Sequence, residues 1–199
     1  MFGFNKKAKA KTAKKNVAKK SAEKKPSEIC VYQLKISLLD TDPPVWRRVL
    51  VKSNTSLEKL HDIIQDSMGW EDCHLHAFDI NRVSYGPEEE NDESIVLSDL
   101  IEKEKQKFQY TYDFGDSWEH KIVVEKILPI EKGKKYPICI DGENACPPED
   151  CGGLPGYYSL LEAIEDPKNP EHEEMLEWIG TDFNPSSFNL KEINKRLKN

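Results

Sequence analysis

The stretch that decides the fold is Phe108-Gln-Tyr-Thr-Tyr-Asp-Phe-Gly-Asp-Ser-Trp-Glu-His-Lys-Ile122. It begins with aromatic and polar residues in alternation (FQYTY), which is the period of a half-buried strand. The polar segment 113–116 interrupts that pattern, and Gly115 can adopt the positive φ that a tight reversal requires. Trp118 and His120 then resume the alternation. The stretch predicts a β-hairpin with two carboxylates at its tip and with Trp118 and His120 on one face.

Charge is unevenly distributed along the chain. Residues 1–25 hold ten lysines and one acid, a net charge of +9, whereas the rest holds 19 basic and 35 acidic residues, a net charge of −16. Ten like charges repel one another, and no apolar stripe is present on which a helix could dock. We therefore expect residues 1–27 to be a disordered basic tail and residues 28–199 to form a single domain.

The basic tail has two possible roles. It can bind nucleic acid by releasing counterions, or it can act only as a solubilising segment, and composition leaves both open. If the tail acts by charge alone, deleting residues 1–25 should remove salt-dependent nucleic-acid binding and leave the thermal midpoint of the domain unchanged.

Membrane insertion and secretion are not indicated. No window approaches the roughly eighteen apolar residues of a membrane span, and mean hydropathy is −0.71. The positively charged N-terminus is not followed by the apolar core of a signal peptide. With an odd number of cysteines, five, these features predict a cytoplasmic protein with reduced thiols and no membrane partner.

Regular elements are predicted on both sides of the hairpin. Thr55 and Glu58 form a capping box that starts a helix, and Gly69 ends it. His61 lies beside the apolar stripe of this helix, where histidines usually flank a core. We expect strands at 31–38, 45–51, 70–80, 108–112, 118–127 and 136–140, helices at 55–69, 98–105, 157–165, 170–180 and 190–197, a solvated loop at 85–93 and an irregular loop at 141–156.

Histidines, acids and thiols gather in the second half of this pattern. On one strand His74 and His76 would project the same way, as metal ligands must. Thiolate and imidazole are zinc's usual ligands, so a zinc ion is a possible cofactor. The candidate ligand-binding residues are His74, His76, Asp113, Asp116, Trp118, His120, Glu149 and Asp150, and the candidate zinc ligands are His74, His76, His120, Cys146 and Cys151.

Each of these signals has a structural alternative. The Cys146-x4-Cys151 spacing is wider than the usual C-x2-C pair of zinc sites and contains two prolines. The histidines could instead hydrogen-bond carboxylates in a buried polar network. A histidine–carboxylate pair can serve as a general base, but it more often holds a loop in place.

The loop at Cys146–Gly153 should fold against the hairpin and against the strand that carries His76. Two prolines and several glycines leave this loop few backbone hydrogen bonds of its own. It must therefore be fixed by side chains, of which Glu149 and Asp150 are the strongest acceptors. We expect the loop to bring a carboxylate or thiol within reach of His120 or His76.

Several longer motifs follow one another along the chain: Val45-Trp-Arg-Arg48, Leu60-His61, Met68-Gly-Trp70, His74-Leu-His-Ala-Phe78, the segment Tyr110–His120, Cys146-Pro-Pro-Glu-Asp-Cys-Gly-Gly153 and Phe183-Asn-Pro-Ser-Ser-Phe188. With these motifs the chain resembles the plasmid pRiA4b ORF-3-like family, a group of largely uncharacterised microbial proteins, some carrying transposon-passenger names. Asn184 stands at the family's usual aspartate. The resemblance runs from about Ile29 to Leu197 and implies an α+β fold with a curled, mainly antiparallel sheet, one helix after the first hairpin and C-terminal helices. It implies no established activity.

Two hypotheses for function follow. The first is a non-enzymatic binding or interaction module whose polar groove lies among the candidate residues, with an association with mobile elements or nucleic acid. The second is a metal-dependent hydrolase that uses the same groove. Phosphate-loop, dinucleotide-binding, nucleophile-elbow and H-E-x-x-H motifs are all absent from the sequence, so no particular reaction is indicated.

Overall fold

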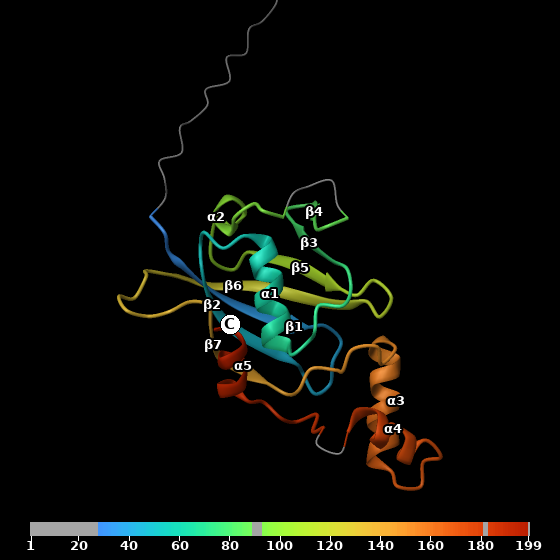
Figure 1. Ribbon diagram of the computed structural model, residues 1–199. Coiled ribbons are helices and arrows are strands. Elements are labelled where there is room, and N and C mark those ends of the chain that lie inside the picture. The colour runs from blue at the N-terminus through green and yellow to red at the C-terminus, as the bar shows by residue number, and fades with distance from the viewer. Residues whose placement is uncertain (1–27, 89–92, 181–182, 199) are drawn as a thin grey trace, which may run out of the picture.

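A seven-stranded antiparallel sheet organises the chain (Figure 1). In the computed structural model, which describes residues 28–88, 93–180 and 183–198, the strands are β1 (Val31–Leu38), β2 (Trp46–Lys52), β3 (His76–Ile80), β4 (Val83–Tyr85), β5 (Lys107–Tyr112), β6 (Trp118–Leu128) and β7 (Ile138–Glu143). Their order across the sheet is β4-β3-β5-β6-β1-β2-β7, and the two edge strands do not meet. The helices are α1 (Leu57–Met68), α2 (Leu97–Leu100), α3 (Gly153–Glu165), α4 (His172–Ile179) and α5 (Leu190–Arg196). The expected α+β fold is confirmed.

The aromatic hairpin is formed by β5 and β6 at the centre of this sheet. Tyr110 pairs with His120 and Tyr112 with Trp118, so the four side chains lie on one face. All four are almost completely buried, which confirms the alternation predicted from the sequence. β1 pairs with the other side of β6, so the hairpin is continuous with the first strand of the chain.

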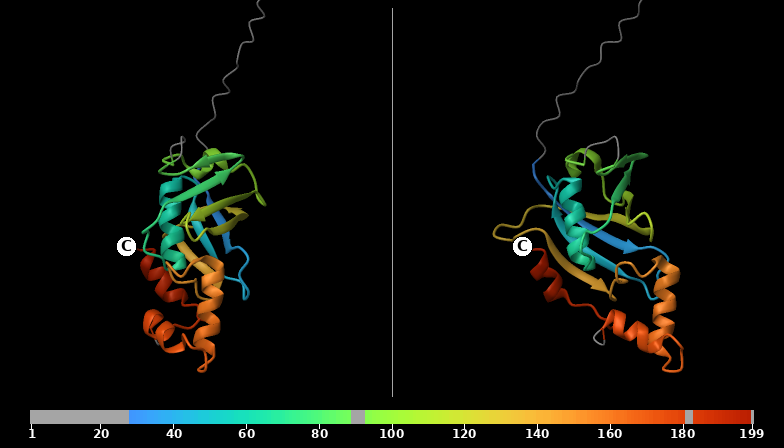
Figure 2. Two further views of the ribbon diagram at one scale, coloured as in Figure 1. Left: turned by 90° about the vertical axis from the view of Figure 1, so that its right-hand side faces the viewer. Right: turned by 45° about the vertical axis from the view of Figure 1, so that its right-hand side comes forward.

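Helix α1 covers the face of the sheet on which the hairpin aromatics lie (Figure 2). Its apolar residues Leu57, Leu60 and Ile64 are fully buried against the strands. The N-cap is Ser56, whose side chain accepts a hydrogen bond from the Lys59 amide, and not Thr55 as the sequence predicted. Gly69, with a φ of 100°, ends the helix as expected.

Several predicted boundaries are wrong. Strand β3 begins at His76, so His74 lies in the preceding loop and does not share the strand face. The helix expected at 98–105 is the single turn α2, which runs only from Leu97 to Leu100 and has no side-chain cap. Tyr85, expected to begin a solvated loop, is buried at the end of β4.

The segment expected to be irregular throughout, 141–156, contains regular structure at both ends. β7 continues to Glu143 because it pairs with β2, where Trp46 is opposite Glu143. At the other end α3 begins at Gly153, directly after Gly152, which has a φ of 88°. Pro155 is tolerated there because the first turn of a helix needs no amide donor.

The C-terminal helices take two positions. α5 packs against β7 and α1, whereas α3 and α4 extend beyond the end of the sheet (Figure 1). None of the described helices is both long enough and apolar enough to span a bilayer. The basic tail predicted at residues 1–27 lies outside the described residues.

Candidate functional site

Three segments distant in sequence meet at the end of the hairpin: residues 70–75, the hairpin turn 113–117 and the loop 144–152. We call this junction the seam. The Trp70 indole donates to the Pro147 carbonyl at 3.0 Å, and the Glu71 amide donates to the Glu149 carboxylate at 2.9 Å. The Gly152 amide donates to the Asp116 carboxylate at 3.2 Å. The prediction that this loop folds against the hairpin is confirmed.

His74, Asp113 and Asp150 form one cluster within the seam, each contributed by a different segment. His74 Nε2 lies 3.1 Å from Asp150 Oδ1 and 3.8 Å from Asp113 Oδ2. That nitrogen is buried, yet no contact satisfies hydrogen-bond geometry, so the histidine faces two carboxylates without a proper bond to either. The three ligand atoms lie within 4.8 Å of one another, close enough to hold one cation.

The hairpin turn that supplies Asp113 is built differently from the prediction. The positive φ values belong to Asp113 (54°) and Ser117 (58°), and Gly115 is not among the positive-φ residues. Aspartate tolerates this conformation because its side chain can bond locally, and Asp113 Oδ1 accepts the Gly115 amide at 2.8 Å. Asp113 therefore holds the turn with one carboxylate oxygen and faces His74 with the other.

A second group of potential ligand atoms adjoins this cluster: Glu71, Cys73 and Glu149, again within 4.8 Å of one another. The Glu149 carboxylate also accepts a hydrogen bond from the Tyr112 hydroxyl. Local desolvation and the charges of Glu149 and Glu71 raise the pKa of the exposed Cys73 thiol. A free Cys73 is therefore held in the protonated form, which is a poor ligand.

His61 belongs to a buried network rather than flanking the core. Its Nδ1 lies 2.7 Å from the Tyr110 hydroxyl, and its Nε2 lies 2.7 Å from Asp72 Oδ1. Gln65 closes the ring, since its amide donates to Tyr110 at 3.0 Å and its oxygen accepts the Asp72 amide at 3.1 Å. With its proton on Nε2, His61 satisfies both of its contacts.

His76 stacks on His61, with the ring centroids 3.5 Å apart. Its Nε2 lies 3.0 Å from a Glu93 carboxylate oxygen. Burial, and then the adjacent His61, lower the pKa of His76. The carboxylate that reaches His76 belongs to Glu93, so the prediction that the Cys146–Gly153 loop would bring one within reach of His76 is wrong.

His120 has no carboxylate or thiol partner, which contradicts its expected place in the site. Its Nδ1 donates to the Trp118 carbonyl at 2.9 Å, and its buried Nε2 has no partner. Complete burial lowers the pKa of His120 to about 4. The Trp118 indole nitrogen is likewise buried without a partner.

The predicted zinc ligand set does not assemble. The two potential cation groups of the described residues include His74 but none of the other four proposed ligands, His76, His120, Cys146 and Cys151. Burial raises the pKa of Cys146 well above its usual range, and that of Cys151 to about 12. All five cysteines are free thiols.

Sequence reasoning missed the residues of the closed ring. His61 and Gln65 are four residues apart on α1, so they share a helix face, and both interrupt an apolar stripe. That pattern could have indicated a buried polar pair. Asp72 and Glu93 carry no such signal, because each lies in an irregular segment whose position depends on the tertiary fold.

Fold and site together define a class: an α+β domain with a seven-stranded antiparallel sheet, helices against one face, and a histidine–carboxylate seam at the end of its central hairpin. The family model "Plasmid pRiA4b ORF-3-like protein" matches residues 30–192, and the chain belongs to this family.

Two relatives extend the match. The chain is 37% identical over 176 residues to "Uncharacterized protein y4hQ" of Sinorhizobium fredii (strain NBRC 101917 / NGR234), with 84% of this chain and 90% of the relative covered. The crystal structure of the protein of unknown function MM3350 from Methanosarcina mazei Go1 is similar, with a TM-score of 0.77 and 39% identity over 82% of this chain and 97% of that one. The chain is therefore similar to proteins whose names state no activity.

Proposed function

We propose that this protein is a binding module whose seam holds a divalent cation between His74, Asp113 and Asp150. The observation that carries the proposal is the buried Nε2 of His74, which has no hydrogen bond although two carboxylates face it. A buried polar atom without a partner is uncommon in a folded protein and calls for an explanation. A cation bound at this point would satisfy the nitrogen and both carboxylates.

The spacing of the donor atoms suits a small ion. Two atoms bound to a tetrahedral zinc ion at about 2.1 Å lie about 3.4 Å from each other. The His74 nitrogen is 3.1 Å from one carboxylate oxygen and 3.8 Å from the other, so its separations fall on either side of that value. The three ligand atoms are one imidazole nitrogen and two carboxylate oxygens. Carboxylate suits both zinc and manganese, whereas imidazole suits zinc, so we expect zinc to bind more tightly than manganese.

A cation here would fix the arrangement of the seam. Asp150 is attached to the loop, Asp113 to the hairpin turn and His74 to the segment before β3. The loop is otherwise anchored by a few hydrogen bonds, of which three come from Trp70, Glu71 and Gly152. We propose that the bound state presents a rigid seam, and the cation-free state a looser one, to a binding partner.

Zinc titration of chelator-treated protein, followed by calorimetry and by thermal midpoint, tests the proposal. His74→Ala, Asp113→Asn and Asp150→Asn should each weaken binding by roughly tenfold or more, because each removes one of three ligands. Asparagine keeps the positive φ of Asp113 and Asp150, 54° and 58°, so these two substitutions change the ligand and not the backbone.

Asp72→Asn is the matched control. Asp72 also has a positive φ, 57°, and contacts a histidine, but it lies outside the cluster. It should leave zinc affinity unchanged. The proposal is wrong if the wild-type protein binds no zinc or manganese at micromolar concentration, or if the three cluster variants bind as tightly as the control.

One observation favours metal-dependent hydrolysis as a second candidate. A pocket of about 280 Å³ opens beside Asp150, with Leu160, Met175 and Trp178 among its walls. Three protein ligands leave a coordination position for water, whose pKa a zinc ion lowers toward neutrality. Zinc-loaded protein should then cleave ester, amide or phosphoester probes, with activity lost in Asp150→Asn and KM raised in Trp178→Ala. If zinc-loaded protein cleaves none of these probes, the hydrolase proposal is wrong and only the binding module remains.

A further inference from the structure

A lysine-lined groove lies at the C-terminal helix, among residues that do not belong to the seam. It has a volume of about 450 Å³ and runs between the β6–β7 loop and α5. Four lysines line it, Lys134 and Lys135 from the loop side and Lys191 and Lys198 from the helix side, and the described residues that line it include no acid. We call it the lysine groove.

Most of this charge is not neutralised by partners. Lys134 pairs with Glu131 at 2.9 Å, whereas the ion pairs among the described residues include none of Lys135, Lys191 and Lys198. The last three are exposed. In a chain with a net charge of −7, three unpaired cations around one concave surface form a local positive field.

The loop that carries Lys134 and Lys135 joins the central strand β6 to the edge strand β7. Val31, the first residue of β1, pairs with Leu128 at the end of β6. The β6–β7 loop then crosses past β1 and β2 to Ile138, which pairs with Leu50. The loop therefore ends at the edge strand against which α5 packs.

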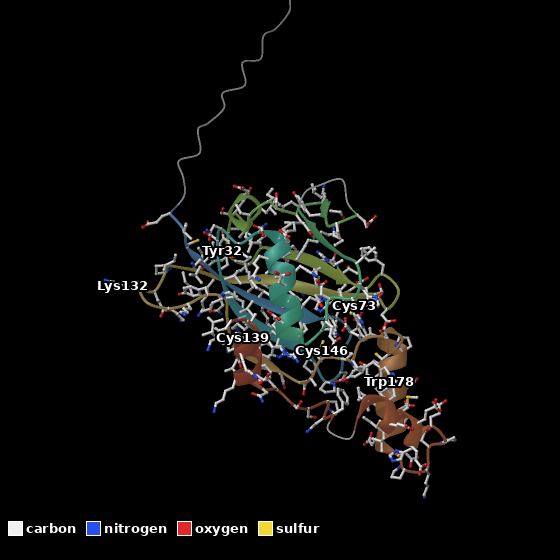
Figure 3. All side chains as sticks on the ribbon, viewed as in Figure 1. Tyr32, Cys73, Lys132, Cys139, Cys146 and Trp178 are labelled. Carbon is white, nitrogen blue, oxygen red and sulfur yellow. The ribbon has the colours of Figure 1, made fainter. Side chains whose placement is uncertain are left out.

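The two ends of the molecule differ in charge. Lys132, in the β6–β7 loop, projects on the side of the molecule opposite Cys73 and Trp178 (Figure 3). The acids of the seam, including Asp113, Asp150 and Glu149, belong to the Cys73 side. A polyanion would therefore be repelled at the seam and attracted at the lysine end.

We propose that the lysine groove binds the phosphate backbone of a nucleic acid. Cations stand on both walls of a concave surface, which suits a linear chain of phosphates better than a flat anionic membrane. The described lining offers no aromatic side chain on which a base could stack, so binding is independent of sequence. This inference does not rest on the proposed cation site.

The test measures the affinity of the full chain for a mixed-sequence DNA duplex as salt is varied. Each lysine that neutralises a phosphate contributes roughly 0.9 to the slope of log K against log salt. Replacing the four groove lysines by glutamine should lower the slope by up to four times this amount and weaken binding at low salt. The matched control carries the same charge change at exposed lysines elsewhere, Lys59, Lys107, Lys121 and Lys168.

A second measurement locates the contact in the unmodified protein. Acetylation of Lys135, Lys191 and Lys198 should slow when duplex is added, while that of Lys107 and Lys121 should not change. Equal slopes for the groove and control variants would overturn the proposal. So would groove variants that bind DNA normally but lose binding to phosphatidylserine vesicles, because the partner would then be a membrane surface.

Discussion

The two histidine clusters near Tyr112 differ in whether their hydrogen bonds are complete. The ring of His61, Tyr110, Gln65 and Asp72 is closed, with a donor for each acceptor. In the seam, His74 Nε2 is buried beside two carboxylates and bonds neither. Since a satisfied network stabilises the fold and an unsatisfied one leaves binding capacity, the first is structural and the second is the candidate site.

The largest expected effect comes from opening the closed ring. His61→Ala should destabilise the protein by about 3 kcal/mol or more, because it leaves a cavity and removes the partner of a buried tyrosine hydroxyl. His74→Ala, with chelator present, should cost less than about 1 kcal/mol, since its contacts are partly exposed. Denaturant unfolding of both variants measures the difference. Similar losses at the two positions would remove the distinction between the clusters.

The second-largest expected effect concerns His120, which differs from His74 in its surroundings. His120 also has an unpaired Nε2, but Trp70 and Tyr110 surround it. Its pKa of about 4 lies below the ordinary 6.5, so on acidification the unfolded chain takes the proton first. Stability is therefore complete above pH 6.5 and falls between about 6.5 and 4, by roughly 3 kcal/mol in total.

His120→Phe should flatten this part of the stability–pH profile, measured by urea unfolding at half-unit intervals. The neighbouring exposed substitution Glu119→Gln serves as control and should keep the slope of the wild-type protein. An unchanged slope in His120→Phe would mean that His120 is protonated in the folded protein.

The smallest expected effect is the change in stability on substituting Gly115 in the hairpin turn, which we compare with substitution of Gly153 at the start of α3. Gly115→Ala should change stability by no more than about 0.5 kcal/mol, because its φ is not positive and the nearest atom to a new Cβ is a carboxylate oxygen of Asp113 at 3.1 Å. Gly153→Ala should be much worse, since its φ is +67° and its Cβ would lie 2.6 Å from the Asp116 carbonyl oxygen. Thermal midpoints compare the two, and a severe Gly115→Ala would mean the reversal depends on glycine after all.

Local sequence determined the elements whose pattern repeats. The alternation of aromatics in β5 and β6 and the apolar stripe of α1 predicted which side chains are buried, because strand and helix periods are properties of the backbone. The docking of the proline loop was also predictable, since a segment with few backbone bonds must be fixed by its side chains. The N-cap of α1 at Ser56 and the start of α3 at Gly153 were not predicted, because neighbouring residues have similar propensities to begin a helix.

Only the tertiary structure decided which histidine belongs to the site. His74, His76 and His120 look alike in sequence, but one faces two carboxylates, one stacks on His61, and one is enclosed by aromatics. Their partners lie far away along the chain, at Asp150, Glu93 and Trp70. Strand pairing and loop closure bring these segments together, and no local pattern encodes the distance between them. The sequence by itself therefore determined that polar histidines would lie near the hairpin, and the packing of three separate segments decided which atoms compose the candidate site.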